Sequence, residues 1–537
     1  MLFSSLFAKT AEYEKLAHAL SAPGACALFG LPGSGRAMVY AALAKETGRF
    51  LCIVTPGEAE ATRFAGDLNA LGIPTAVFPA RDYVLRPIEG TAREYEYRRL
   101  SVLGDIVGGR LQAVCVPDEG LTQYTTPRAE FCNNTRTLHP GDTVPRTELT
   151  ALLYNAGYAR RAQVDGPGQF SIRGDIVDLY APDMKLPVRM EFWGDEIDTM
   201  HSFDLATQRR EDPIEKIYVS PAREVLFGSP AEAAELLRAF IKKFRGKKRT
   251  ALEACLATEL AQLDGGALPV NMDKYLAVRY PQPATLLDYF DDPLLVLEEP
   301  ASLREAERAT TYRRGEEISA LLQDGVLAAG LDNLYAEDGY LWAQAANHRT
   351  ICAENFARSM PDIPLKDIVN APAHTLPAWG GEVTSLLEDL QPLCNGGAAV
   401  TVLAGTQRAA AGLAADLRTK GLLVTTDPDA APGAGLVQVL PGQLSAGCSV
   451  PFAKYALFTA RAFGISSTQK KKKRNKDALN SLSEIAVGDL VVHQNHGIGR
   501  YAGIQRMAVQ GVTKDYLRIE YDKKDVLYVP VTQLDLL

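Results

Sequence analysis

The sequence has no apolar run long enough to cross a bilayer, which takes about 18 to 20 consecutive apolar residues. Its N-terminal stretch also lacks the sustained apolar segment and cleavage-site ending of a secretory signal peptide. Paired cysteines are missing too: the eight cysteines are scattered, and none form a C-x-x-C pair or a cysteine–histidine cluster with zinc spacing. We therefore expect a cytoplasmic protein with reduced thiols, no membrane partner and no metal site.

An excess of positive charge is also missing. The 57 lysine and arginine residues face 65 aspartate and glutamate residues, which gives a net charge of −8. Proteins that bind nucleic acid over their whole surface usually lean basic. Any contact with nucleic acid must therefore be local, and proteins are the expected partners. The length of 537 residues predicts several domains.

One motif is present in its spacing but lacks two of its chemical groups. Residues 25–40 read ACALFGLPGSGRAMVY, an apolar strand, a glycine loop and a helix-like stretch, with the spacing of G-x-x-x-x-G-K-[ST]. Arginine replaces the lysine, and its fork can still face a phosphate. Alanine replaces the hydroxyl residue, and a methyl group cannot ligate Mg²⁺. We interpret the segment as a degenerate nucleotide loop without nucleotide, weak phosphate binding being the alternative; its residues are Gly30, Gly33, Gly35, Arg36 and Ala37.

The remaining pattern predicts a multidomain α/β and α+β protein. Residues 1–130 alternate apolar runs with amphipathic stretches, which indicates a parallel α/β sheet. Residues 131–222 are predicted to form a small inserted α+β domain, and residues 223–365 a mainly helical second part of the first domain, with one strand at 294–297. Residues 366–465 are predicted to form a further small α/β domain.

The end of the chain changes character twice. Residues 466–480 read SSTQKKKKRNKDALN, which is either a nucleic-acid or phosphate-binding patch or a solvated linker. The linker interpretation is preferred, over residues 466–483. Residues 484–537 contain several short alternating runs within about fifty residues, which predict a small β-barrel.

Three stretches together resemble one family, the bacterial transcription-repair coupling factors. The first two lie in residues 157–178 (GYARR…GQFSIRGDIVD) and residues 187–209 (PVRMEFWGDEID…SFD…TQR). Both look like the domain that this family shares with the excision-repair protein UvrB and that contacts UvrA. The third stretch, residues 487–530 (VGD…HGIGRY…DY…LYVP), looks like the CarD-type RNA-polymerase-interacting domain.

The resemblance implies that the family continues into a double-stranded-DNA translocase motor. The chain stops at Leu537, so it is either a fragment or a short relative. ATP and Mg²⁺ would belong to that motor, and DNA contact would come through it or weakly through residues 466–480. Where UvrB carries a D-E-x-H motif, this chain reads Glu298-Glu299-Pro300. Two halves of an ATPase are thus altered, and we expect a scaffold without enzymatic activity or cofactor.

The resemblance also assigns two recognition surfaces. Arg173, Arg189 and Trp193 match residues with which the family engages UvrA. The alternative is that Arg189 pairs internally with Glu191 or Asp195 and that Trp193 is partly core. For the β subunit of RNA polymerase, the family adds an edge strand from the terminal module. The candidates there are Arg500, Tyr501, Ile504, Arg506 and Met507, the alternative being that Ile504 is core and Met507 caps it.

These assignments predict an adaptor that tethers stalled RNA polymerase to UvrA in transcription-coupled nucleotide excision repair. The alternatives are a UvrB- or helicase-type nucleotide-dependent enzyme with residual ATP binding, and a transcription regulator that uses only the CarD-like module.

Overall fold

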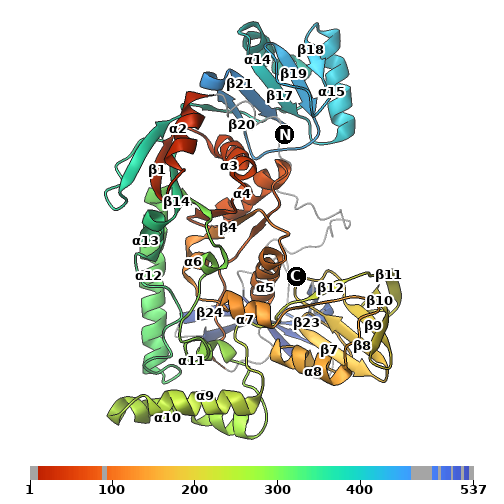
Figure 1. Cartoon of the computed structure of the whole chain (residues 1–537), viewed down its shortest axis with the longest axis vertical. Coiled ribbons are helices and arrows are strands. Elements are labelled where there is room, and N and C mark those ends of the chain that lie inside the picture. Colours follow the sequence, from red (N-terminus) through yellow and green to blue (C-terminus); the bar gives the residue numbers. More distant parts are fainter. Residues whose placement is uncertain are drawn as a thin grey trace.

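A computed structural model of the chain describes residues 10–86, 93–460, 487–493, 497–509, 512–521 and 525–530. Its centre is a parallel sheet of seven strands in the order β15-β1-β14-β13-β2-β4-β3 (Figure 1). The strands are β1 (Gly24–Phe29), β2 (Leu51–Thr55), β3 (Thr75–Val77), β4 (Ala113–Pro117), β13 (Leu294–Glu298), β14 (Arg349–Glu354) and β15 (Leu365–Asn370).

The inner strands of this sheet are continuous apolar runs because helices cover both faces. On one face, α2 (Ala11–Ala19), α3 (Gly33–Thr47) and α4 (Glu58–Ala70) pack against β1, β2 and β13. The other face packs against α5 (Glu94–Val107), α6 (Asp118–Thr122), α7 (Arg128–Asn133), the start of α12 (Pro300–Gln323) and α13 (Tyr340–Asn347). The predicted parallel α/β sheet is confirmed, and its strands come from both ends of the first 370 residues.

A second unit interrupts the first between α7 and the helical region. Its six-stranded sheet has the order β11-β10-β9-β8-β7-β6, and α8 (Arg146–Asn155) packs on its inner face. The strands are β6 (Ala159–Arg160), β7 (Gln169–Arg173), β8 (Ile176–Tyr180), β9 (Val188–Trp193), β10 (Glu196–Phe203) and β11 (Arg210–Pro213), with a separate pair β5 (Arg136–Leu138) and β12 (Ile217–Val219). This is the sheet-containing insertion that the sequence predicts.

The chain then forms a helical region before it returns to the central sheet. Helices α9 (Pro230–Lys242) and α10 (Gly246–Asp264) form a hairpin that lies along the bottom of Figure 1. Short helices η1 (Met272–Tyr275), α11 (Leu276–Arg279) and η2 (Leu286–Tyr289) follow, and α12 runs along one side of the molecule.

The third unit is a six-stranded mixed sheet in the order β16-β20-β21-β17-β19-β18. Its elements are β16 (His374–Leu376), α14 (Val383–Asn395), β17 (Ala399–Leu403), α15 (Gln407–Thr419), β18 (Leu423–Thr425), β19 (Leu436–Leu440), β20 (Gly447–Val450), η3 (Pro451–Ala453) and β21 (Tyr455–Thr459). The boundary expected between residues 365 and 366 falls inside β15, which pairs with β1. The first sheet therefore extends to residue 370, and the small α/β unit begins after it.

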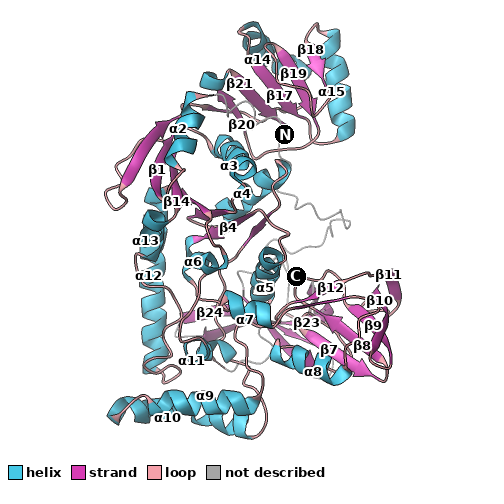
Figure 2. Ribbon diagram, in the orientation of Figure 1, coloured by secondary structure: helices cyan, strands magenta, loops and turns pink. Residues whose placement is uncertain are grey.

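The C-terminal unit is a four-stranded antiparallel sheet in the order β22-β23-β24-β25. Its strands are β22 (Leu490–His493), β23 (Gly497–Val509), β24 (Val512–Glu520) and β25 (Val526–Pro530). The predicted short strands are thus present, and closure of the sheet into a small β-barrel stays a prediction. The basic stretch at residues 466–480 lies outside the described residues. Within the described part of the chain, no helix combines the length and apolar character that a membrane span requires. Figure 2 shows the same arrangement by secondary structure.

Candidate interaction sites

The glycine loop forms the turn from β1 into α3. Gly30 has a φ of +91°, and a Cβ there would lie 3.1 Å from the carbonyl oxygen of Ala371, so the turn requires glycine. Helix α3 begins at Gly33 after Pro32, with no side-chain cap. The predicted strand–loop–helix is therefore confirmed, with Gly35, Arg36 and Ala37 buried in the first turn of α3.

Arg36 does not face an open phosphate cradle, because its guanidinium is ion-paired inside the protein. Nη1 lies 2.8 Å from Oε2 of Glu298, and Nη2 lies 2.8 Å from Oε1 of Glu299. The hydroxyl of Tyr40 donates to Glu298 at 2.6 Å. Burial alone would lower the pKa of Arg36, but the two carboxylates outweigh it and hold that pKa above its ordinary value.

Both carboxylates stand at the end of β13. Glu298 is the last residue of the strand, and burial raises its pKa although Arg36 acts in the opposite direction. Glu299 precedes α12 with a φ of +50°, a left-handed conformation that non-glycine residues rarely adopt. This strained residue presents its carboxylate to Arg36. The arginine of the altered loop and the two glutamates of the altered D-E-x-H segment therefore pair with each other.

The third unit covers the loop and α4 from outside. The backbone N–H of Ala373 donates to the carbonyl of Gly30 at 3.1 Å. Asp67 of α4 accepts from both the backbone N–H and the hydroxyl of Ser445, each at 2.6 Å. Leu444, Cys448 and Leu457 of the third unit share one apolar core with α3. The loop thus lies in an interface between two units.

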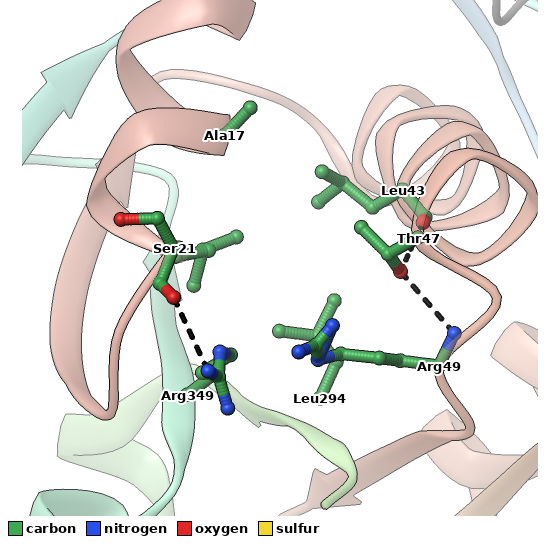
Figure 3. Close-up of a pocket in the computed structure, with 8 residues that line it drawn as sticks. Ala17, Ser21, Leu43, Thr47, Arg49, Leu294 and Arg349 are labelled. Atoms are coloured by element: carbon green, nitrogen blue, oxygen red, sulfur yellow. Dashed lines mark hydrogen bonds between the residues drawn. The ribbon is translucent and has the colours of Figure 1, made fainter.

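A cavity of about 190 Å³ lies at the opposite end of the sheet (Figure 3). Ser21, Arg49, Leu294 and Arg349 line it, at or just before the amino ends of β1, β2, β13 and β14. Asp292 pairs with both arginines, at 3.1 Å from Arg49 and 2.6 Å from Arg349. Because the glycine loop follows the carboxyl end of β1, this cavity is unrelated to it.

In the second unit, Arg173 and Arg189 converge on one buried carboxylate. Arg189 holds Asp178 with two bonds, from Nε at 2.7 Å and from Nη2 at 2.9 Å, and Arg173 adds one at 2.6 Å. Asp178 and Arg189 are directly opposite on β8 and β9. The alternative in which Arg189 pairs with Glu191 or Asp195 is wrong, because the cross-strand register places Asp178 beside it.

The two arginines differ in how accessible their guanidinium groups are to a partner protein. Arg189 is 12% exposed, also donates to the carbonyl of Gln208, and stacks over the ring of Phe203. Its bonds to Asp178 raise its pKa, which keeps it charged. Arg173, at the end of β7, is 47% exposed and bonds to Asp178 through Nη2. Arg173 is therefore the arginine that an approaching protein can reach.

Trp193 is 84% exposed at the end of β9, so the alternative that it is partly core is wrong. The turns after β7 and β9 lie at the same end of the sheet, because Ile176 pairs with Glu191. Arg173 and Trp193 precede these two turns, at Gly174 and Gly194. A large apolar ring and an accessible guanidinium thus share one sheet end.

In the C-terminal sheet, the predicted polymerase-binding residues separate into inside and outside positions. Tyr501 is buried among Val491, Leu517 and Ile519, so it serves the core and cannot contact a partner, which corrects its assignment. Ile504 is 50% exposed, so the alternative that it is core is wrong. Arg500 is exposed and donates to the carbonyl of Gly488 at 2.9 Å. The side chains of Arg506 and Met507 lie outside the described ones.

The outer face of β22 and β23 carries apolar side chains that the sequence prediction missed. Leu490, Val492 and Ile498 are exposed, while Val491 between the first two is buried. Val492 is opposite Ile498, and Leu490 is opposite Arg500. The four residues therefore share one face, which we call the β22–β23 face. The sequence gives no clear signal for the buried face, because Leu490, Val491 and Val492 are apolar at three consecutive positions.

The strand β23, which carries the predicted polymerase-binding residues, is an edge strand over only part of its length. β23 pairs with β22 through residues 497–500 and with β24 along most of its length, so its first part is an inner strand. Tyr501 still bonds to Asp489 and Gly488. Within the described residues, positions beyond Tyr501 pair with β24 alone. On β23, it is this second part that no described strand covers on the β22 side.

Two family models match parts of this chain. The model described as the UvrB interaction domain matches residues 137–225, the unit that carries Arg173, Arg189 and Trp193. The model described as the CarD-like/TRCF RID domain matches residues 485–537, which contain the four-stranded C-terminal sheet. Both recognition modules expected from the sequence are confirmed as modules.

Whole-chain comparison extends this likeness. The transcription-repair-coupling factor of Bacillus subtilis is 29% identical over 524 residues, which cover 95% of this chain. The chain resembles the transcription-repair-coupling factors. The same-named proteins of Staphylococcus haemolyticus and Staphylococcus aureus are 26% and 25% identical over 94% of the chain. The chain spans 44% of the length of each of these coupling factors, in their N-terminal portion.

Proposed function

We propose that this chain is a non-catalytic adaptor that links RNA polymerase to UvrA in transcription-coupled nucleotide excision repair. The observation that supports it best is that each matched module exposes apolar and basic side chains at one surface. In the UvrB-type module these are Trp193 and Arg173, and in the CarD-type module they are the β22–β23 face.

The UvrA-binding surface in this proposal is the sheet end that bears Arg173 and Trp193. Arginine and tryptophan are enriched among residues that contribute most to protein–protein affinity. Arg189 has a different role here: it holds Asp178, which in turn orients Arg173. We therefore propose Arg173 and Trp193 as contacts and Arg189 as a positioning residue.

The polymerase-binding surface in this proposal is the β22–β23 face, together with Ile504 and the free edge of β23. An exposed edge allows a partner to add a strand through main-chain hydrogen bonds, and neighbouring apolar side chains add specificity. Four exposed residues, Leu490, Val492, Ile498 and Ile504, supply the apolar contact, and Arg500 supplies a charge at its rim. The partner would be the β subunit, as expected for this kind of module.

The proposal requires no nucleotide or metal in this chain. Arg36 is held by Glu298 and Glu299, Ala37 carries no hydroxyl, and the third unit covers the loop. These three features argue against the alternative of a UvrB- or helicase-type enzyme with residual ATP binding. The basic stretch at 466–480 is the candidate in this proposal for weak contact with DNA.

Calorimetric titration of UvrA without nucleotide tests the first half of the adaptor proposal. The wild-type chain is expected to bind, and Arg173→Glu is expected to abolish binding while Arg136→Glu, on the separate β5–β12 pair, leaves it unchanged. Binding that appears only after a motor domain is added would contradict a constitutively exposed surface. Equal binding by wild type and Arg173→Glu would retain the adaptor and reject the residue.

A pull-down with RNA polymerase tests the second half. Val492→Lys is expected to weaken binding at least tenfold without unfolding the sheet, because the side chain is exposed. Tyr501→Ala is expected to lose binding together with the fold, since Tyr501 is core. Retained binding by Val492→Lys would exclude this face. A ternary complex with UvrA and polymerase would then demonstrate the bridge directly.

A further inference from the structure

The tip of the α9–α10 hairpin is the most basic stretch of the described chain. Residues 242–249 read KKFRGKKR, and no acidic residue lies between Glu235 and Glu253. All six basic side chains in this stretch are exposed. Arg249 pairs with Glu253 at 2.8 Å, and Lys243 lies over the ring of Phe240. Within the described part of the chain, the other four side chains make no ion pair or side-chain hydrogen bond; they are Lys242, Arg245, Lys247 and Lys248.

The basic side chains in the first turn of α10 are electrostatically unfavourable for the helix. The N-terminus of a helix carries partial positive charge, so a cation in the first turn costs about 0.3–1 kcal/mol where an acidic residue would stabilise. The first turn of α10 holds Lys247, Lys248 and Arg249 and no acidic residue, and Arg245 at the N-cap makes no capping hydrogen bond. An anion bound here would relieve the repulsion and accept from uncapped backbone N–H groups.

The hairpin presents this charge on a fixed support. Leu237 and Ile241 of α9 pack against Leu252 and Leu256 of α10 in one buried core. Gly246 turns the chain with a φ of +57°, between the two helices. Behind the tip, Phe240 and Phe244 form an edge-to-face pair. A Cβ at Gly330 would lie 2.8 Å from the Phe244 ring, so the rings pack directly on that backbone. The tip is therefore an anchored end of an outermost element (Figure 1).

We propose that the α9–α10 tip contacts the phosphodiester backbone of duplex DNA. The composition favours nucleic acid over an acidic protein: lysine is depleted at protein–protein interfaces, whose centres are apolar and aromatic. No large hydrophobic side chain is exposed within residues 242–250. Lysine, arginine and helix N-termini are the usual phosphate contacts. Without exposed aromatic rings for base stacking, the tip suits a duplex rather than a single strand.

This contact is separate from the two recognition modules. The tip belongs to the helical region after residue 225, outside both matched segments. It also differs from the basic stretch at 466–480, which lies elsewhere in the chain. The tip adds a sequence-independent third contact, and its strength depends on salt because each neutralised phosphate releases counterions.

Fluorescence anisotropy with a short labelled DNA duplex tests the proposal on the full chain. The variant Lys242→Gln/Lys247→Gln/Lys248→Gln removes three exposed cations that pair with no acidic side chain of the described residues. A matched control, Lys216→Gln/Arg408→Gln/Lys420→Gln, removes three exposed cations from the second and third units. We expect the tip variant to bind at least tenfold more weakly at about 50 mM salt, with the slope of log K against log salt reduced by about 2–3. The control is expected to stay within twofold of wild type.

Several outcomes would overturn the proposal: no duplex binding by the wild type, equal losses in both variants, or loss of all binding when only residues 470–474 are neutralised. Displacement of the duplex by polyglutamate at equal charge concentration would favour an acidic protein partner instead. The thermal unfolding midpoint of the tip variant should equal or exceed that of wild type, because its changes relieve repulsion at α10. A lower midpoint with retained DNA binding would assign the cations a structural role and also overturn the proposal.

Discussion

The guanidinium of Arg36 lies 2.8 Å from the carboxylate of Glu298, which joins the first turn of α3 to the end of β13 inside the protein. Both side chains are almost fully buried, and Tyr40 donates a further bond to the same carboxylate. A buried ion pair is sensitive to the loss of one partner, because the remaining charge is left without compensation.

Replacing one residue of this pair should therefore lower the free energy of unfolding more than replacing both. Arg36→Met is expected to lower the free energy of unfolding by about 3–5 kcal/mol, and Arg36→Met/Glu298→Leu by much less. Urea unfolding of the two single variants and the double variant gives the coupling as a double-mutant cycle. Additive losses would show that the pair is not coupled as the structure indicates.

Restoring the consensus residues of the loop should not restore nucleotide binding. Arg36→Lys/Ala37→Thr supplies the missing lysine and hydroxyl, yet Glu298 and Glu299 still face residue 36 and the third unit still covers the loop. We expect no binding of a fluorescent ATP analogue with Mg²⁺ by the wild type or by this variant. Micromolar binding by either would contradict the scaffold interpretation.

Of the two arginines that bond to Asp178, Arg189 should contribute to the stability of the second unit and Arg173 should contribute little. Arg189→Ala is expected to lower the free energy of unfolding of the second unit by about 2–4 kcal/mol, because buried Asp178 loses its bidentate partner. Arg173→Ala is expected to cost less than about 1 kcal/mol, since Arg189 still satisfies Asp178 and Arg173 is half exposed. Thermal unfolding compares them, with Arg136→Ala as a control at a partly exposed arginine that pairs with Glu148 instead of Asp178. Equal losses of stability in Arg189→Ala and Arg173→Ala would refute this division of roles.

Asp118 should make stability depend on pH near neutrality. Burial, with the nearby Glu307 charge, raises the pKa of this carboxyl to about 7, and its Oδ1 has no hydrogen-bond partner. The folded state then holds the proton more tightly than the unfolded chain, where an aspartate has a pKa of about 3.9. The contribution is fully present below about pH 4 and is lost as the pH rises through about 7.

The variant Asp118→Asn removes this dependence. At pH 8 it is expected to unfold with a free energy about 2–4 kcal/mol higher than the wild type, at roughly 1.4 kcal/mol per unit of pKa. At pH 4 the two proteins should be nearly equal. Urea unfolding at both pH values measures the difference, and a variant that is less stable than wild type at pH 8 would refute the assignment.

The sequence predicts elements best where periodicity and length are clear. The strand–loop–helix around Gly30 and the strand at 294–297 are found where expected. The sequence analysis missed β14 and β15. In β15, Leu365–Asn370 mixes charged and apolar residues, and the strand pairs with β1, which lies more than three hundred residues earlier in the chain. Its role depends on that long-range contact, which local pattern does not contain.

The sequence identified candidate site residues, but it did not show which side chains they contact. Trp193 stood out as an interface residue from the resemblance, and the structure exposes it. The shared partner Asp178 requires the register between β8 and β9, which alternation alone does not fix. Tyr501 was assigned to the partner-facing side although it is buried, and the exposed Leu490 was not assigned at all, because the sequence pattern does not show which face of the sheet is covered.

The bonds from Ser445 to Asp67 join the third unit to α4, and the bond from Ala373 to Gly30 joins it to the glycine loop. In nucleotide-driven machines this place opens and closes with each turnover. Here the two units share one apolar core and these hydrogen bonds at that place. Force applied to the third unit would therefore be transmitted to β1 through those contacts.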